Sequence, residues 1–241
     1  LPGVVPGFNL ALRATCAAGD AVLVQTPVYP PMLKAPDNWG LRRVDAPLTP
    51  AGLVEPASFR AAAAEAGRSG QGAFLLCNPR NPTGRVFRRE AVSAMAGSCL
   101  AAGLSIVSDE IHCDLVFDGR PHIPVATLAP EVSARTITLM SAGKTWNIAG
   151  LCAAWAVVED AALRARFAAA IAGVADHVNI LGLIATTAAL DHGEPWRQEV
   201  LAYLQGNRDW LAAAVAARLP QLHMIRPEGT YLAWLDFAGA E

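Results

Sequence analysis

Short, wholly apolar runs alternate with longer runs of helical pattern through the first two thirds of the chain. The apolar runs predict buried strands at residues 21–25, 41–44, 73–77, 104–108, 136–140 and 153–158. Helices are predicted between several of these strands, at residues 10–18, 56–66 and 89–102. Strands without polar alternation that are separated by helices are typical of a mostly parallel sheet covered on both faces. The pattern therefore predicts the α/β class.

Beyond residue 160 the pattern becomes helical, with predicted helices at 161–172, 179–190 and 195–219. The last is long for a globular helix, and we expect it to cross a domain boundary. Two strands around the Pro227-Glu228-Gly229 turn follow it. We predict a large domain at residues 1–205 and the beginning of a small C-terminal α/β domain at 206–241. The start at Leu-Pro-Gly and the stop just after a strand-like run favour an internal portion of a longer protein, with its N-terminal segment missing.

The composition narrows the classes of function. The 241 residues are 53% hydrophobic and 17% charged, with a net charge of −2. Such a chain is not disordered, and its charge balance argues against nucleic acid or an anionic membrane as the main partner. The longest uncharged apolar stretch, 178–190, is shorter than the roughly 18 residues that a membrane span needs.

The five cysteines are widely spaced and form no C-x-x-C pair: Cys16, Cys77, Cys99, Cys113 and Cys152. An odd number of such residues, most of them inside apolar runs, predicts reduced thiols and a cytoplasmic location.

The chain has only two lysines, Lys34 and Lys144, so any chemistry that needs a lysine amine has two candidates. Lys34 lies among Pro and Asp residues and is expected to be exposed. Lys144 follows the predicted strand 136–140, where a buried amine can hold an aldehyde cofactor covalently. A solvated surface lysine is the ordinary alternative. A nucleotide P-loop at SAGKTW is disfavoured, because its first glycine would fall on Thr138 and a strand follows in place of a helix.

Polar clusters follow four of the predicted strands: PVYPP, NPRNPTG, DEIHCD and SAGKTWN. The carboxyl ends of parallel strands meet at one edge of a sheet, and ligands bind there in open α/β folds. We therefore expect these four clusters to converge on one site.

Each candidate in these clusters has an ordinary and a functional interpretation. Asp109 either caps the end of its strand or holds the N–H of a pyridinium ring. Asn81 forms the turn that its Pro and Gly neighbours require, or donates to a phenolate oxygen. Tyr29 either packs in the core or stacks on a flat cofactor. His112 is by default a satisfied polar residue near the surface.

The segment Gly3-Val4-Val5-Pro6 precedes the first predicted helix, and Pro6 suits a first helical turn. Backbone amides at such a helix start bind phosphate well, although a plain helix start is the simpler interpretation. A metal site built from His112, Cys113 and His122 is not expected, because no second ligand cluster has a recognisable spacing.

Together these motifs resemble the class I/II aminotransferase family of pyridoxal-phosphate enzymes, of fold type I. Within it they are most similar to the MalY/PatB branch of cystathionine β-lyases, or C–S lyases. The matching strings are GVVPGFNLALRA, VLVQTPVYPP, LLCNPRNPTGRVF, IVSDEIHCDLVF, SAGKTWNIAGL and RPEGTYLAWLDF. They occur in family order over nearly the whole chain. The resemblance implies a fold type I large domain, pyridoxal 5′-phosphate as cofactor and a homodimer.

The resemblance also implies a role for each candidate around the cofactor ring. Lys144 would be the Schiff-base lysine and the proton-transfer base. Asp109 would pair with the pyridine nitrogen and Asn81 with the ring hydroxyl. His112 stands near that hydroxyl, where many relatives carry a Tyr, and Tyr29 would stack on the ring.

At the phosphate end, the resemblance implies binding by Ser141 and by the amides of Val4 and Val5. The wider family has an arginine eight residues after the lysine, where this chain has Cys152. A residue other than arginine there is similar to the lyase branch, and it leaves less positive charge for the phosphate. The family's arginine for the substrate carboxylate is expected beyond Glu241.

The implied reaction is α,β-elimination from a small sulfur-containing amino acid of the cystathionine or cysteine type, giving a thiol, pyruvate and ammonia. Transamination by the same lysine is the first alternative. A non-catalytic or inactive truncated protein of the same fold is the second. The residues of the chain alone do not decide among the three.

Overall fold

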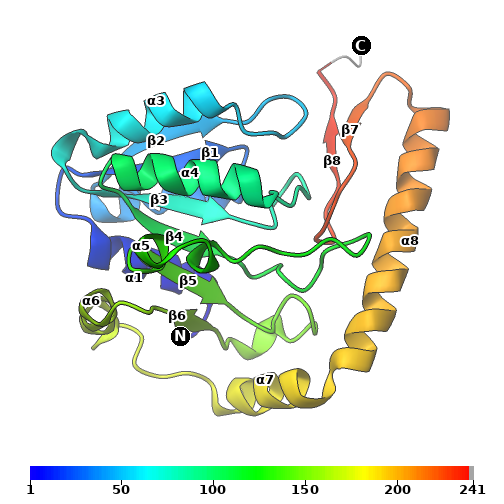
Figure 1. Cartoon of the computed structure of the whole chain (residues 1–241). Coiled ribbons are helices and arrows are strands. Elements are labelled where there is room, and N and C mark those ends of the chain that lie inside the picture. The colour runs from blue at the N-terminus through cyan, green and yellow to red at the C-terminus, as the bar shows by residue number, and fades with distance from the viewer. Residues whose placement is uncertain (239–241) are drawn as a thin grey trace.

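The computed structural model describes residues 1–238 and forms a six-stranded sheet between helices, followed by a two-stranded hairpin (Figure 1). The strands are β1 (Ala21–Thr26), β2 (Arg42–Pro47), β3 (Gly72–Cys77), β4 (Ser105–Asp109), β5 (Thr136–Met140), β6 (Trp155–Val157), β7 (His223–Ile225) and β8 (Trp234–Asp236). The helices are α1 (Val4–Thr15), α2 (Pro30–Lys34), α3 (Pro56–Ala66), α4 (Arg89–Ala101), α5 (Pro130–Ser133), α6 (Ala161–Ile171), α7 (Ile180–His192) and α8 (Glu194–Arg218). Single 3₁₀ turns are η1 (Asp37–Trp39), η2 (Gly67–Ser69), η3 (Val125–Thr127) and η4 (Ala149–Leu151).

The large sheet has the order β2-β1-β3-β4-β5-β6, and the strands β1 to β5 pair in parallel. The predicted mostly parallel sheet is therefore confirmed. Strand β6 runs antiparallel to β5 and is shorter than the predicted run 153–158. The segment between β5 and β6 holds only η4, without the crossover helix that a parallel return requires.

Alternate residues of the buried strands face two separate helical layers. On one face of β1, Val22 and Val24 share a core with α1 and α6. On the other face, Leu23 shares a core with α3 and α4. Both faces of the sheet are covered, which explains why the sequence of the strands is apolar without alternation.

Helix α1 begins at Val4 and ends at Thr15, so the predicted bounds of 10–18 are wrong at both ends. Pro6 lies in the first turn, where its missing N–H costs no helical hydrogen bond. The chain leaves the helix before Asp20, whose carboxylate accepts a backbone hydrogen bond in the following turn. The C-terminal end of α1 leads into the start of β1, and its first residues lie at the opposite edge of the sheet, where the parallel strands end.

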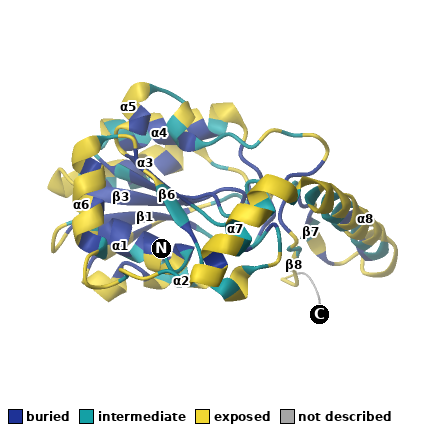
Figure 2. Cartoon of the chain, turned by 90° about the horizontal axis from the view of Figure 1, so that it is seen from below, coloured by how far each residue is buried: buried dark blue, intermediate teal, exposed yellow. Residues whose placement is uncertain are grey.

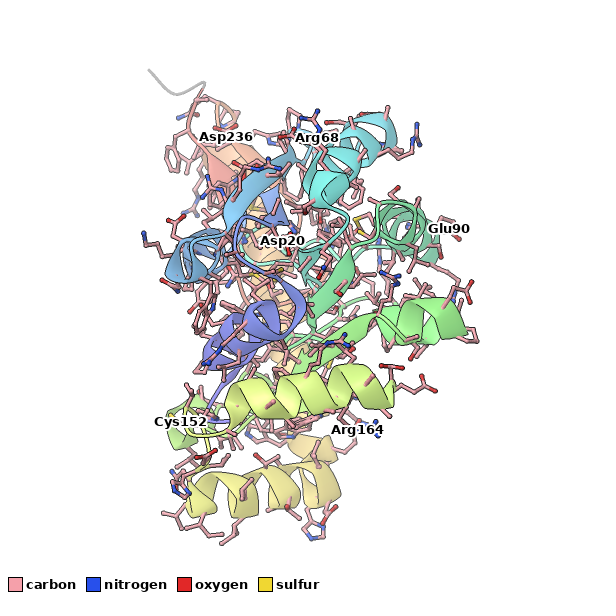
Figure 3. All side chains as sticks on the ribbon, turned by 90° about the vertical axis from the view of Figure 1, so that its left-hand side faces the viewer. Asp20, Arg68, Glu90, Cys152, Arg164 and Asp236 are labelled. Atoms are coloured by element: carbon pink, nitrogen blue, oxygen red, sulfur yellow. The ribbon has the colours of Figure 1, made fainter. Side chains whose placement is uncertain are left out.

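Helices α7 and α8 lie beside the sheet and carry mostly exposed residues (Figure 2). Helix α8 continues through the predicted domain boundary after residue 205, and the hairpin β7–β8 follows it as expected. Figure 3 shows Asp236 of β8 near the top of the molecule, and Cys152 and Arg164 in its lower half. Residues 239–241 of the predicted second domain lie outside the described residues. None of the helices within 1–238 combines the length and apolar character that crossing a membrane would require.

Candidate active site

The carboxyl ends of β1, β3, β4 and β5 and the start of α1 surround a cavity of about 300 Å³. All eight of the predicted site residues line it: Val4, Val5, Tyr29, Asn81, Asp109, His112, Ser141 and Lys144. The four polar clusters thus converge as the strand order requires. The roles assigned to these residues stay predictions, while their placement around one cavity is a property of the fold.

Asp109 is a buried carboxylate at the end of a central strand, only 4% exposed. In the described part of the chain, its one hydrogen-bond donor is the backbone N–H of Ile111, 3.1 Å from Oδ1. Burial raises the pKa of Asp109 to about 7, against the lowering effects of the Ile111 N–H and the Lys144 charge. A buried carboxylate with spare acceptor capacity suits a cationic N–H partner, which would favour its ionised form.

His112 is 2% exposed, so its interpretation as a satisfied residue near the surface is wrong. Its Nδ1 atom is buried and has no hydrogen-bond partner within residues 1–238. Burial lowers the pKa of His112 to about 4, and the Lys144 charge acts in the same direction. The imidazole is therefore neutral at pH 7, and one of its nitrogens remains for a bound polar group.

The two lysines occupy opposite environments. Lys144 lies in the loop after β5, half-buried, and lines the cavity. The side chain of Lys34 is 71% exposed and pairs with Asp37 at 3.0 Å between Nζ and Oδ2. The predicted exposure of Lys34 is confirmed, which leaves Lys144 as the amine at the strand ends.

The start of α1 supplies donors at one wall of the cavity. Val4 and Val5 are its first residues, and Gly3 before them provides no side-chain cap. The N–H groups of a helix's first turn have no acceptor within the helix, and the helix dipole favours an anion there. One wall of the cavity therefore offers free backbone donors that suit an anion, while position 152 provides no side-chain cation, since Cys152 stands there and is exposed.

Ser141 also lines the cavity, but its hydroxyl already makes two hydrogen bonds within the protein. Its Oγ donates to the carbonyl of Ala153 at 2.7 Å and accepts from the N–H of Gly143 at 3.0 Å. Because a hydroxyl has a single hydrogen, Ser141 can donate to an anion only by rotating away from Ala153. The backbone amides of α1 are thus the readier donors.

Two residues that the sequence analysis did not single out support the cavity. Arg80 is fully buried, and its guanidinium donates to the carbonyls of Gln25 at 2.6 Å and Pro27 at 2.7 Å. It therefore ties the loop before Tyr29 to the loop that carries Asn81. Arg80 stands inside a turn-forming string, and no feature of that string indicates a buried partner far away in the sequence.

Tyr231 is the second missed residue. Its ring lies edge-on to the ring of His112, with centroids 5.5 Å apart and planes at 74°. Lys144 Nζ stands over the same ring, 5.9 Å from its centroid. The only sequence feature that pointed to Tyr231 was its place directly after the turn in the string RPEGTYLAWLDF. Among residues 1–238 no group of three or more His, Cys, Asp or Glu is placed to hold a metal ion.

The comparisons with known proteins agree with this arrangement. Residues 1–241 match the family described as aminotransferase class I and II. The chain is 34% identical to cystathionine beta-lyase PatB of Bacillus subtilis over 98% of its own length and 62% of that protein. The crystal structure of OvoB superposes with a TM-score of 0.92 at 42% identity, covering 99% of this chain and 63% of that one.

The pyridoxal-phosphate-bound C–S lyase of Staphylococcus hominis superposes with a TM-score of 0.90 at 31% identity. That match covers 98% of this chain and 61% of the lyase. The chain thus spans less than two thirds of each of these relatives.

Proposed function

Because the chain belongs to the aminotransferase class I and II family, we propose that it binds pyridoxal 5′-phosphate and cleaves carbon–sulfur bonds as a β-lyase. The proposed substrate is cystathionine or a related cysteine-type amino acid; with uptake of one water molecule, the products are a thiol, pyruvate and ammonia. The names of PatB and of the S. hominis lyase support this choice. The observation that carries it is the meeting of Lys144, Asp109 and His112 with the start of α1 around one cavity.

The residues of the cavity fit this cofactor. Lys144 provides an amine for its aldehyde, and the buried Asp109 carboxylate suits its ring N–H. The uncapped start of α1 suits its phosphate. The unpartnered Nδ1 of His112 and the amide of Asn81 suit the ring hydroxyl. When bound, pyridoxal phosphate supplies an electron-accepting ring that stabilises negative charge at the substrate's α-carbon.

In this proposal the protein's own groups position the substrate and move protons. With the cofactor bound, the free Lys144 amine would act as the base that takes the substrate's α-proton. Asp109 would hold the ring nitrogen in its protonated form. The positive charge of that N–H would in turn lower the pKa of Asp109 from the value of about 7 to which burial raises it. Tyr29, which lines the cavity from the loop after β1, would pack against the cofactor ring.

Amino transfer is the alternative, which the family description supports. One assay distinguishes β-elimination from amino transfer. The loaded protein is given cystathionine without a keto acid, and pyruvate is measured. Release of pyruvate at a steady rate is expected; amino transfer to an added keto acid with no pyruvate would exclude the lyase.

A protein without catalytic activity is the second alternative. Incubation with pyridoxal phosphate is expected to produce an absorbance band that Lys144→Ala abolishes and Lys34→Ala retains, because only Lys144 lines the cavity. Absence of the band from the unaltered protein would contradict cofactor binding.

The proposal includes a homodimer and a cytoplasmic location. Large apolar side chains of α7 are exposed, with Ile180 at 64%, Leu181 at 61% and Ile184 at 59%, and a second copy of the chain would cover them. All five cysteines are free thiols, which is the usual state in a reducing compartment.

A further inference from the structure

We propose that Tyr231 is a substrate-binding residue of this site, whose ring face meets the substrate's ammonium group beside Lys144. The inference rests on the proposed function, since it assumes an amino acid that exchanges with the Lys144 amine. None of the motif-based roles includes Tyr231, and it comes from the hairpin β7–β8, outside the large sheet.

The position of the ring relative to Lys144 is the first observation. Lys144 Nζ stands over the Tyr231 ring at 5.9 Å from its centroid, within the range of about 6 Å in which a cation is attracted to an aromatic face. A substrate amine that replaces the Lys144 amine must arrive at nearly the same point. The ring that attracts one ammonium group is therefore placed to attract the other.

Tyr231 contacts the site through His112 and is itself accessible from solvent. Its edge contact with His112 fixes it against a buried residue of the cavity. Tyr231 nevertheless remains 44% exposed, and it lines a second cavity together with Thr230 and Leu232.

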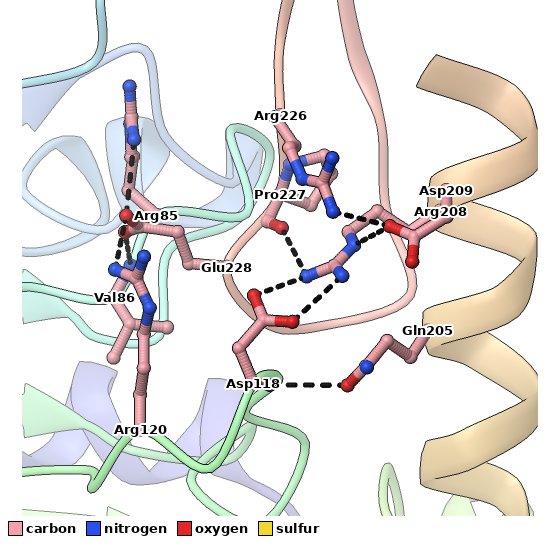
Figure 4. A network of polar contacts seen from close by, with 10 residues as sticks. All are labelled: Arg85, Val86, Asp118, Arg120, Gln205, Arg208, Asp209, Arg226, Pro227 and Glu228. Carbon is pink, nitrogen blue, oxygen red and sulfur yellow. Dashed lines mark hydrogen bonds and ion pairs between the residues drawn. The ribbon is translucent and has the colours of Figure 1, made fainter. Parts of the chain in front are cut away.

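The turn that delivers Tyr231 is clamped to the loops of the large sheet (Figure 4). Glu228 Oε1 accepts from Arg120 at 2.6 Å and from Arg85 at 3.3 Å. Its Oε2 accepts from the N–H of Val86 at 3.0 Å. Gly84, at φ 69°, allows the close approach, because a Cβ there would lie 2.6 Å from Pro227. The turn is thus fixed relative to the cavity.

Helix α8 contributes to the same clamp. Arg208 donates from two nitrogens to the two carboxylate oxygens of Asp118, at 2.7 and 2.9 Å. The same guanidinium reaches the carbonyl of Pro227 at 3.5 Å. The hairpin is therefore held both from the loops of the large sheet and from the long helix that leads into it.

Thr230, directly before Tyr231, carries backbone strain. It is fully buried with φ 66°, a left-handed conformation that a β-branched residue adopts rarely and at a cost. Its N–H donates to the carbonyl of Leu115 at 2.7 Å, and its Oγ1 accepts from the N–H of Leu232 at 3.1 Å. These bonds hold the strained residue, and the chain direction that it sets turns Tyr231 toward His112.

The first test needs no turnover. The lysines of the cofactor-free chain are converted to ¹³C-dimethyl-lysines, and their signals are assigned with Lys34→Arg and Lys144→Arg. A ring over Nζ shifts the Lys144 methyl signal, so Tyr231→Leu is expected to move that signal. Tyr231→Phe, which keeps the ring, is expected to leave it in place. The Lys34 signal stays unchanged in both and serves as an internal control.

The second test measures amino-acid binding. The concentration of cystathionine that half-saturates the absorbance change of the pyridoxal-phosphate-loaded protein is compared among variants. Tyr231→Leu is expected to raise it about 2- to 5-fold, the loss typical of a partly exposed cation–π contact. Tyr231→Phe and the control Tyr203→Leu, 70% exposed on α8, are expected to leave it unchanged.

The outcomes separate this proposal from the proposed lyase activity. A Lys144 signal that Tyr231→Leu does not move would overturn the placement of the ring. A moved signal with unchanged amino-acid binding would overturn the substrate contact. Binding that depends on the ring while no pyruvate forms would uphold Tyr231 as a substrate-binding residue and reject the lyase.

Discussion

At the scale of single residues, the unusual feature of the site is the buried carboxylate of Asp109, which has no charged hydrogen-bond donor among residues 1–238. Asp109 sits at the end of β4 with one backbone donor, and burial raises its pKa to about 7. In the unfolded chain the same group ionises near its ordinary value of about 4. The folded protein without cofactor therefore binds a proton more tightly than the unfolded chain between these two values.

This difference predicts a pH-dependent effect of Asp109→Asn on the cofactor-free protein. The folded form gives up stability as the pH rises from about 4 through about 7, because the buried carboxylate is then forced to ionise. Asp109→Asn removes that penalty, so the variant is expected to unfold at higher urea than the parent at pH 8. The difference is expected to shrink toward pH 4.

Urea unfolding at pH 4 and pH 8 checks the expectation, with the exposed Asp191→Asn as a control that is expected to change nothing at either pH. If Asp109→Asn were destabilised equally at both pH values, burial would not be disfavouring the ionised form of Asp109. With cofactor bound, the order is expected to reverse, because Asp109 then has a cationic partner.

The candidate residues of the site were predictable because they follow strands. Asp109, Asn81 and Lys144 each come directly after an apolar run, and parallel strands bring such ends together. Tyr231 was not predictable in this way. It follows no strand of the large sheet, and the hydrogen bonds of Glu228 hold its turn near the site. The hydrogen bond from the Ser141 hydroxyl could not be predicted either, because its acceptor, the carbonyl of Ala153, lies across the β5–β6 connection.

At the scale of elements, loops fixed by buried polar contacts shape the cavity. Arg80 is the strongest example, because its fully buried guanidinium joins the loop after β1 to the loop after β3. Desolvation lowers the pKa of Arg80 to about 10, which still leaves it charged at neutral pH. Its stability in the interior depends on the carbonyls that accept its hydrogen bonds.

Arg80→Ala is therefore expected to lower the free energy of unfolding by about 2 to 4 kcal/mol, since the buried carbonyl of Gln25 and the part-buried carbonyl of Pro27 lose their donor. The midpoint of urea unfolding measures this change. Arg68→Ala, at an exposed position on η2, is the matched control and is expected to change the free energy by less than about 0.5 kcal/mol. An Arg80 variant as stable as the control would contradict the proposed tie between the loops.

Most elements could be predicted from the pattern of apolar residues, and the exceptions have physical reasons. The direction of β6 depends on whether a crossover helix precedes it, and the segment 141–154 does not reveal this by its periodicity. The early start of α1 depends on Pro6, which is as acceptable within a first turn as before one.

At the scale of the whole molecule, exposed apolar side chains are distributed unevenly over the surface. The sheet is covered on both faces, whereas α7 exposes several large apolar side chains, among them Ile184 and Leu190. Exposed apolar residues scattered singly are ordinary, but a group of them along one helix indicates a contact surface. The apolar pattern of 179–190 predicted the helix without indicating that the helix lies at the surface.

A homodimer through this surface predicts the effect of Ile184→Glu. A charge placed in an apolar interface is expected to weaken the dimer about tenfold or more. Analytical ultracentrifugation over a range of concentrations measures the dissociation. Leu53→Glu, at a position 51% exposed outside α7, is the control that is expected to keep the dimer. An unaltered protein that sediments as a monomer, or two variants that dissociate equally, would reject α7 as the interface.

The central claim is that one amine of this chain, Lys144, holds pyridoxal phosphate in the cavity at the strand ends. The most direct measurement is to incubate the protein with the cofactor, reduce it with borohydride to make the bond permanent, and locate the adduct by mass spectrometry of its peptides. The adduct is expected on the peptide that carries Lys144. An adduct on Lys34 alone, or no adduct at either lysine, would contradict the account.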